Sequence, residues 1–241
     1  MKRPISITAH RGARGLVKHE NTLESFEKAI EVGAHAIEFD VRKSADDILF
    51  IHHDAQIDDV TLSTLSYQEI IKLAQKHDYI PPTLEEVLLA MKHRIFMDIE
   101  LKEMGYEEVF IDAILKHLEP HMFYIRTFDD SSIRAIKKVH PEVTVGLLLG
   151  VETPKHGVWT RLGELFPLAR IIKTRCDFIS PHYRLVKFAY AFRMHCLKKP
   201  VYVWTVNDES LMIKMIKKHV DGLVTDYPNI ALNLLKKAEG N

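Results

Sequence analysis

The chain has 241 residues, of which 46% are hydrophobic and 27% charged, a balance typical of a soluble globular protein with a sizeable core. Lysine plus arginine equals aspartate plus glutamate at 33 each, so the whole-chain charge gives no argument for nucleic acid or an acidic membrane as the main partner. No apolar run approaches the roughly 20 residues of a membrane span, and no secretory leader pattern is present, which predicts a cytoplasmic protein without membrane insertion.

Eight short apolar runs, most of them rich in β-branched residues, recur along the chain and predict strands. They are ISITAH (5–10), AIEFDV (36–41), IFMDIE (95–100), FYIRTF (123–128), TVGLLLG (144–150), FISPHY (178–183), VYVWTV (201–206) and GLVTDY (222–227). Most intervals between them show helical periodicity. This alternation predicts an α/β fold, a (β/α)8 TIM barrel, with a doubly wound open sheet as the alternative.

Several of the predicted helices carry start or stop signals. TLESFEKAIEVG follows Asn21, is amphipathic and ends at a glycine. Ser66 opens S-Y-Q-E and Thr83 opens T-L-E-E, and both patterns are capping boxes that begin helices. The segments NDESLMIKMIKKH and NIALNLLKKAE follow the last two predicted strands.

A ninth apolar run, ILFIHH (48–53), follows the second strand too closely for a parallel crossover, so it must return antiparallel as a hairpin. With the tip at residues 46–47, His53 pairs with Asp40, and their Cβ atoms lie roughly 5 Å apart. Because alternate residues of a strand share a face, Glu38 joins this pair. The hairpin is therefore expected to bring a histidine to two carboxylates.

Polar side chains follow the ends of several predicted strands. They are His10 and Arg11 at the end of the first strand, Glu100 and Lys102 at the end of the third, and Thr127, His182, Trp204 and Asp226 at the ends of later strands. Active sites of barrel enzymes form at the C-terminal ends of the strands, so we expect these side chains at one mouth. Such a concentration of charge requires ligands or partners that neutralise it.

Three carboxylates, Glu38, Asp40 and Glu100, could be rim charges paired with arginine or lysine. However, two of them lie within apolar strands and all three can converge. A convergent set of carboxylates suits a hard divalent cation, Mg²⁺ or Ca²⁺, better than zinc, which would prefer the histidines. We therefore expect a metal site at the barrel mouth.

His10 and His53 are weak signals when taken alone, but together they flank the carboxylates as a general acid and a general base would. His52 is expected to point to the opposite face in a structural role. Arg11 and Lys102 are either salt-bridge partners or, next to a metal, ligands of a phosphate.

Two further residues have open roles. Asp54 either orients the preceding histidine or begins the next turn. Trp204 fills the barrel mouth or contacts the substrate.

Motifs along nearly the whole chain, from residue 5 to about residue 228, resemble those of the glycerophosphodiester phosphodiesterases, whose fold is a (β/α)8 barrel. They are H-R-G (10–12), E-N-T-L-E-S-F (20–26), G-A-H-A-I-E-F-D-V (33–41), H-D (53–54), P-T-L-E-E-V-L (82–88), I-E-L-K (99–102), W-T-V-N (204–207) and D-G-L-V-T-D-Y-P (221–228). Their shared order and spacing carry the resemblance.

The resemblance implies a role for each candidate residue. Glu38, Asp40 and Glu100 would bind the divalent metal, His10 and His53 would be the acid–base pair, and Arg11 and Lys102 would contact phosphate. Residues 55–81 correspond to the family's variable insertion, here a small cap with one helix near 66–77 within a single domain over residues 1–241. His19 stands where the family usually has proline, and Asp47 where it usually has a hairpin glycine.

The implied reaction is metal-dependent hydrolysis of glycerophosphodiesters, such as glycerophosphocholine, glycerophosphoethanolamine and glycerophosphoglycerol, to glycerol 3-phosphate and an alcohol. This places the protein in glycerol and lipid metabolism. The nucleophile is either water or the glycerol 2-hydroxyl. We favour the hydroxyl, with His10 as base and His53 as acid in the first step, because intramolecular attack has a large effective molarity. The preferred alcohol, the metal and the oligomeric state stay open.

Three other functions compete with this one. A phospholipase on a similar barrel would use the same two histidines but would need an apolar rim facing the membrane. A glycosidase could use two carboxylates, yet it would not need His10, His53 and Lys102 together. A non-catalytic binding barrel should have lost at least one metal or histidine position, and none is lost.

Overall fold

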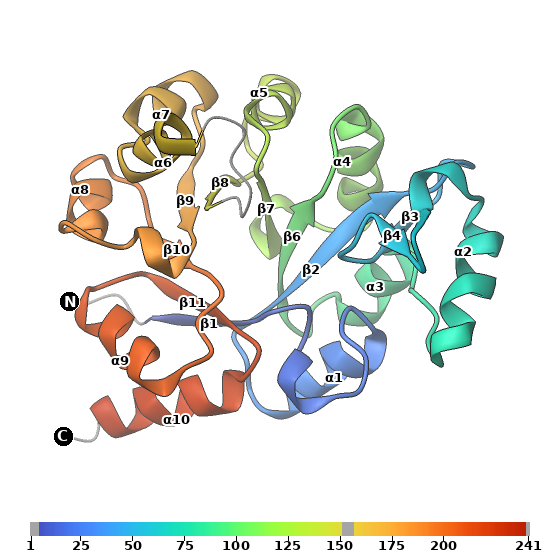
Figure 1. The fold of residues 1–241 in the computed structure, drawn as a ribbon, viewed down its shortest axis with the longest axis horizontal. Helices are drawn as coiled ribbons and strands as arrows, with labels where there is room; N and C mark the ends of the chain where they lie inside the picture. Colours follow the sequence, from blue (N-terminus) through green and yellow to red (C-terminus); the bar gives the residue numbers. More distant parts are fainter. Residues whose placement is uncertain (1–4, 151–156, 240–241) are drawn as a thin grey trace.

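The computed structural model describes residues 5–150 and 157–239, and its main sheet forms a nearly closed barrel (Figure 1). The eight parallel strands are β1 (Ser6–Ala9), β2 (Ala36–Lys43), β6 (Phe96–Leu101), β7 (Phe123–Thr127), β8 (Val145–Leu149), β9 (Phe178–Pro181), β10 (Tyr202–Val203) and β11 (Gly222–Thr225). They pair in the order β10-β11-β1-β2-β6-β7-β8-β9. Isolated bridges from Ile179 to Val201 and from His182 to Trp204 join the two ends. The predicted barrel is confirmed, and the open sheet is wrong.

Helices surround this ring, and several begin at caps that the sequence supplies (Figure 1). They are α1 (Leu23–Glu31), α3 (Leu84–Met91), α4 (Glu107–Leu115), α5 (Asp130–Val139), α6 (Gly157–Leu165), α7 (Leu168–Thr174), α8 (Tyr190–Cys196), α9 (Glu209–Lys217) and α10 (Pro228–Glu239). The hydroxyl of Thr22 accepts the backbone N–H of Ser25, and Gly33 follows α1 with φ +81°, which glycine adopts freely. Thr83 and Glu86 form the predicted capping box of α3.

β2 shows how a buried strand can carry charge to the barrel mouth. Phe39 is fully buried and packs on Phe26 of α1, with ring centroids 5.5 Å apart, so it faces the helical layer. Because side chains alternate along a strand, Glu38 and Asp40 face the barrel interior. Both carboxylates are buried there.

The hairpin strand β3 (Leu49–Ile51) runs antiparallel to β2, as predicted, but the predicted register is wrong by one residue. The backbone N–H of His52, in place of that of His53, meets the carbonyl oxygen of Asp40 at 3.0 Å. The cause is the turn, which has one residue more than predicted. Its last residue, Asp47, has φ +63°, a left-handed conformation that aspartate tolerates and that is typical of three-residue hairpin loops.

The side-chain alternation of β3 stops at Ile51, and this decides where the two histidines lie. The guanidinium of Arg42 donates to the carbonyl oxygen of His53 from Nε at 3.0 Å and from Nη2 at 2.6 Å, which draws the chain away from the ladder. His53 therefore lines the barrel mouth. His52 stacks on Tyr79, with ring centroids 6.2 Å apart.

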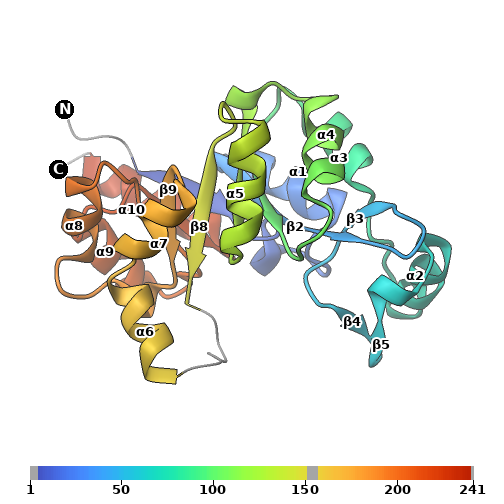
Figure 2. The same cartoon turned by 90° about the horizontal axis from the view of Figure 1, so that it is seen from above.

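The predicted insertion, residues 55–81, lies beside the barrel on the side toward which the carboxyl end of β8 points (Figure 2). It contains β4 (Gln56–Ile57), β5 (Val60–Thr61) and α2 (Tyr67–Ala74), which begins at the capping box that Ser66 predicts. Its small core consists of Phe50, Ile57, Leu62, Ile70, Leu73 and Ala74. That residues 1–241 form one domain stays a prediction. None of the described helices is long and apolar enough to cross a membrane.

A buried ion pair crosses the barrel interior between β6 and β7. Arg126 pairs with Asp98, both side chains are almost completely buried, and Arg126 Nη1 also donates to Ser180 Oγ at 3.1 Å. Burial lowers the pKa of Arg126 to about 10, so it stays protonated at neutral pH. A charged guanidinium therefore lies beneath the barrel mouth, and Asp98 neutralises it.

We expect Arg126→Met to lower the free energy of unfolding by about 3–5 kcal/mol, because Asp98 would be left buried without its partner. Urea denaturation followed by circular dichroism measures this. The double variant Asp98→Asn, Arg126→Met removes both charges and should recover a substantial part of the loss. If the single variant is as stable as the native chain, Asp98 does not depend on Arg126 for its burial.

Candidate active site

A cavity of about 480 Å³ opens at the carboxyl ends of the strands. Its lining includes the eight side chains for which the sequence predicts a role in catalysis or in binding the metal or substrate, namely His10, Arg11, Glu38, Asp40, His53, Glu100, Lys102 and Trp204. Of the other strand-end residues expected at the mouth, His182 and Asp226 line the cavity and Thr127 does not. The eight residues come from β2 and β6, the hairpin, and the segments that follow β1, β6 and β10. The parallel barrel thus brings together positions that lie far apart in the sequence.

Three carboxylates converge in this cavity because of the strand register. Asp40 of β2 pairs directly with Glu100 of β6, and Glu38 lies two residues earlier on the same face of β2. One oxygen from each of the three side chains lies within 4.8 Å of the others, and all three residues are buried. This set of hard oxygen ligands fits a divalent cation such as Mg²⁺ or Ca²⁺.

Neighbouring donors fix the orientation of Asp40. The amide nitrogen of Asn21 donates to one carboxylate oxygen at 2.8 Å, and Lys102 Nζ lies 3.2 Å from the other. The same ammonium lies 2.7 Å from Glu100 Oε1. Lys102 therefore bridges two of the three carboxylates, which is the salt-bridge role that the sequence left open.

The electrostatics of this cluster favour an additional cation. The pKa of Glu100 is raised to about 7, because burial together with repulsion from Asp40 and Glu38 outweighs the attraction of Lys102. Burial and the charge of Asp40 also raise the pKa of Glu38. Burial would raise the pKa of Asp40 as well, but Lys102 and Arg11 hold it well below its usual range. Glu38 and Glu100 thus resist ionisation, whereas Asp40 is readily ionised. A divalent cation would stabilise the ionised form of all three carboxylates.

Arg11 lies against the same carboxylates and keeps one donor unused. Its backbone N–H donates to Glu38 Oε2 at 2.9 Å, and its Nη1 donates to Glu20 Oε1 at 2.6 Å. Its Nε lies 3.5 Å from Asp40 Oδ2 but is buried without a hydrogen-bond partner among the described residues. A buried guanidinium donor left over at a cavity wall suits an anionic ligand.

His10 is held from behind by a carboxylate at the end of β11. Its Nδ1 lies 2.6 Å from Asp226 Oδ1, and Asn207 donates to the other oxygen of Asp226 at 2.7 Å. Burial would raise the pKa of Asp226, but the hydrogen bond from His10 lowers it. Because Asp226 engages Nδ1, Nε2 is the ring nitrogen of His10 that is left for a ligand in the cavity.

His53 has a similar support from the residue that follows it. Its Nδ1 lies 2.7 Å from Asp54 Oδ1, which favours the orienting role of Asp54 over a role in the turn alone. Burial and the nearby charge of Lys102 lower the pKa of His53, so its neutral form is favoured. Each of the two cavity histidines is thus paired with an aspartate through Nδ1.

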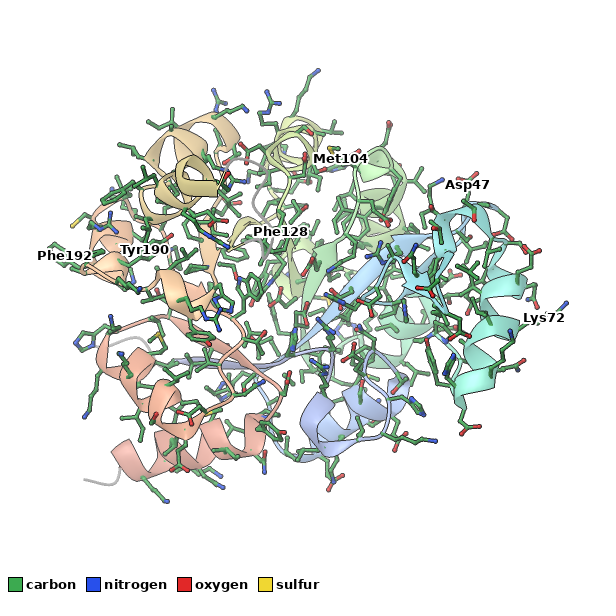
Figure 3. All side chains as sticks on the ribbon, in the orientation of Figure 1. Asp47, Lys72, Met104, Phe128, Tyr190 and Phe192 are labelled. Atoms are coloured by element: carbon green, nitrogen blue, oxygen red, sulfur yellow. The ribbon has the colours of Figure 1, made fainter. Side chains whose placement is uncertain are left out.

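An aromatic wall completes the cavity. Trp204 donates from Nε1 to the carbonyl oxygen of Ser180 at 2.8 Å, and its ring meets Phe128 edge to face with centroids 5.7 Å apart. His182 makes a second edge contact with Trp204 at 5.2 Å. Figure 3 places Phe128 near the centre of the barrel view, and Phe128 lines the cavity. The wall supplies an apolar surface for a part of a ligand that carries no charge.

Four of these residues have contacts that the sequence did not predict. Asn21 and Asp226 position a carboxylate and a histidine from distant segments, while Arg126 and Phe128 line the cavity. The pairing of Arg126 with Asp98 could have been predicted from the sequence. Arg126 lies within an apolar run, as Asp98 does on the preceding strand, and opposite charges inside neighbouring buried strands are expected to pair.

Comparison with known proteins gives a consistent result. The model of the glycerophosphoryl diester phosphodiesterase family matches residues 10–230. A glycerophosphodiester phosphodiesterase of Caldanaerobacter subterraneus subsp. tengcongensis is 31% identical over 254 residues, which covers 96% of this chain and 98% of the relative.

Solved structures show the same fold. A glycerophosphodiester phosphodiesterase of Parabacteroides distasonis matches with a TM-score of 0.83 and 24% identity, covering 99% of this chain and all of that one. An Oleispira antarctica phosphodiesterase in complex with the product sn-glycerol-3-phosphate matches with a TM-score of 0.80 and 23% identity, covering 98% of this chain and 97% of that one. The chain belongs to the glycerophosphoryl diester phosphodiesterase family, because the family model and the Caldanaerobacter relative both match nearly the whole chain. Members of this family are phosphoric diester hydrolases.

Proposed function

We propose that the chain hydrolyses glycerophosphodiesters, such as glycerophosphocholine, glycerophosphoethanolamine and glycerophosphoglycerol, to glycerol 3-phosphate and a free alcohol. The convergence of three buried carboxylates and two aspartate-supported histidines in one cavity carries this proposal. The complex of the Oleispira antarctica phosphodiesterase with sn-glycerol-3-phosphate supports the same product. A role in glycerol and lipid metabolism and a cytoplasmic location stay predictions.

In this proposal, Glu38, Asp40 and Glu100 hold a divalent metal, Mg²⁺ or Ca²⁺. When bound, the metal would act as a Lewis acid toward the phosphoryl oxygens. Arg11 and Lys102 stabilise the negative charge that develops on the phosphate. Trp204 contacts the substrate from the aromatic wall.

His10 and His53 divide the proton transfers between them. In the first step, the glycerol 2-hydroxyl of the substrate attacks the phosphorus, and Nε2 of His10 takes its proton. His53 protonates the oxygen of the departing alcohol. Asp226 and Asp54 hold the two rings at Nδ1, so each ring offers its other nitrogen to the substrate. The neutral form that burial favours for His53 means that it must gain a proton before it can act as the acid.

A panel assay tests the activity. Glycerophosphocholine, glycerophosphoethanolamine and glycerophosphoglycerol are each incubated with the native chain, with and without chelator, and the release of glycerol 3-phosphate is measured. We expect release from at least one substrate, loss of release in chelator, and recovery on addition of Mg²⁺ or Ca²⁺. Full activity in excess chelator would remove the metal from the proposal, and no release from any substrate would refute the activity.

Glu100→Gln should weaken metal binding by at least about ten-fold, because it removes a negative ligand and keeps the shape of the side chain. Isothermal titration with Mg²⁺ or Ca²⁺ measures the affinity without turnover. The control is Glu108→Gln, which removes an exposed carboxylate on α4 and should leave the affinity unchanged. Equal affinities for both variants would show that Glu100 is not a ligand.

A further inference from the structure

The zero net charge of the chain conceals an uneven distribution along it. Residues 160–199 carry nine lysines and arginines against two acidic residues, whereas the rest of the chain carries 24 basic and 31 acidic residues. The basic segment includes α7, α8 and most of α6. The argument from whole-chain charge against an acidic surface as a partner therefore does not hold for this side of the barrel.

The same segment exposes aromatic side chains. Phe166, Phe188 and Phe192 are 56%, 74% and 68% exposed, and they are the exposed phenylalanines among the described residues. Arg193 joins them into one surface, because its guanidinium lies 4.6 Å from the ring centroid of Phe166 and its Nε donates to the carbonyl oxygen of Phe188. Phe192 lies on α8, which begins two residues after Phe188, and Figure 3 places Phe192 at the outer edge of the molecule.

The backbone and the neighbouring charges set this surface apart from an ordinary helix face. Phe188 and Ala189 both have left-handed φ values, +49° and +52°, which are uncommon for residues other than glycine. Arg184 and Lys187 precede them and are exposed, and neither forms a salt bridge with a described residue. The guanidinium of Arg184 lies 5.7 Å from the ring centroid of Tyr183. Two cations without a carboxylate partner among the described residues thus precede the exposed aromatic rings, Lys187 directly.

We propose that this surface, formed by Phe166, Arg184, Lys187, Phe188 and Phe192 and here termed the α8 surface, docks on an anionic lipid membrane. Exposed aromatic side chains bordered by lysine and arginine are the combination that binds the lipid interface, with the rings among the headgroups and the cations at the phosphates. Neither a spanning helix nor insertion is required. His182, which lines the active-site cavity, lies on the same connection from β9 to α8, so docking would hold the cavity near the lipid surface.

Vesicle sedimentation tests this without any turnover, so its outcome is independent of the proposed hydrolysis. The native chain should sediment with vesicles of phosphatidylcholine and phosphatidylglycerol, should not sediment with phosphatidylcholine alone, and should be released by salt. Arg184→Gln and Lys187→Gln together should weaken binding by roughly twenty-fold. Phe188→Ser and Phe192→Ser should each weaken it by roughly ten-fold or more.

Leu89→Ser and Val109→Ser are the matched controls. These side chains are 59% and 52% exposed on α3 and α4, at the other side of the barrel from α8 (Figure 1), and their loss should not change binding. Circular dichroism checks that every variant is folded. Failure of the native chain to bind anionic vesicles, or equal binding by the Phe188→Ser variant, would overturn the proposal. A dimer in sedimentation velocity that Phe188→Ser dissociates, without vesicle binding, would assign the surface to a second copy of the chain instead.

Discussion

His10→Ala and His53→Ala should each lower kcat by about two to four orders of magnitude, the usual effect of removing a general acid or base. The structure gives each ring an aspartate at Nδ1 and a place in the cavity wall, so neither loss can be replaced by a neighbouring group in the same position. Steady-state kinetics with the best substrate of the panel measure the effect. KM should change far less than kcat, because both histidines act in the proton transfers.

His52→Ala is the control for this prediction, since it removes an adjacent histidine that stacks on Tyr79 outside the cavity lining. Burial lowers the pKa of His52 to about 4, so it is neutral at the pH of the assay and carries no charge to the site. We expect a far smaller loss of kcat than for His53→Ala. The opposite ranking would show that His52 supplies the acid or base, contrary to the arrangement described here.

Asp226→Asn adds a test of the support behind His10. Asparagine keeps the size of the side chain, but it removes the charge that holds Nδ1 at 2.6 Å. Activity should fall, though less than in His10→Ala, because the ring remains present but is less firmly oriented. Activity equal to that of the native chain would mean that Asp226 does not position His10.

The architecture was predictable because its signals are local. Each barrel strand is a short apolar run, and the caps at Thr22, Ser66 and Thr83 are set by residues three positions apart. Parallel strands in a barrel leave one end for the active site, so polar residues at the strand ends meet there, with Thr127 as the exception. The convergence of the three carboxylates follows from these two facts.

The hairpin register was not predictable from the same signals, because it depends on how many residues the turn takes. Residues 45–47 all lie in the loop, since Ser44 and Ile48 are hydrogen-bonded to each other through the backbone. Residues 45–47 suit a two-residue turn as well as a three-residue turn. The extra turn residue shifts every residue pair between β2 and β3 by one. His53 still reaches the cavity because Arg42, a residue without a local signal, holds its carbonyl oxygen.

Contacts between distant loops were likewise beyond the sequence. Asn21 reaches Asp40 from the segment before α1, where it adopts φ +55°, and Asp226 reaches His10 from the other end of the chain. Each of these contacts depends on the conformation of a loop far away in the sequence. No sequence pattern around Asn21 or Asp226 indicates which side chain it contacts. The sequence predicted Asp226 at the mouth but not Asn21, and it did not predict which side chain either of them would orient.

A substrate that lacks the glycerol 2-hydroxyl distinguishes the two nucleophiles. In the route that we favour, this hydroxyl attacks the phosphorus to give a cyclic phosphate, which water then opens while His10 and His53 exchange roles. Well-oriented intramolecular groups reach effective molarities of about 10⁵–10⁸ M, far above what a freely diffusing nucleophile offers. A cavity of about 480 Å³ with His10 and the three carboxylates on its wall has room to hold the hydroxyl beside its base.

We therefore expect an analogue with propane-1-phosphate in place of the glycerol 3-phosphate unit to release its alcohol at least about a thousand-fold more slowly than the parent compound. Polar groups that receive the hydroxyl would also be left unpaired by the analogue, which lowers its reactivity further. The measurement follows release of the alcohol, and quenched samples of the parent reaction are searched for the cyclic phosphate. The control is binding of the analogue as a competitive inhibitor, which shows that it occupies the cavity. Turnover of the analogue near the parent rate would exclude the 2-hydroxyl and leave water as the nucleophile.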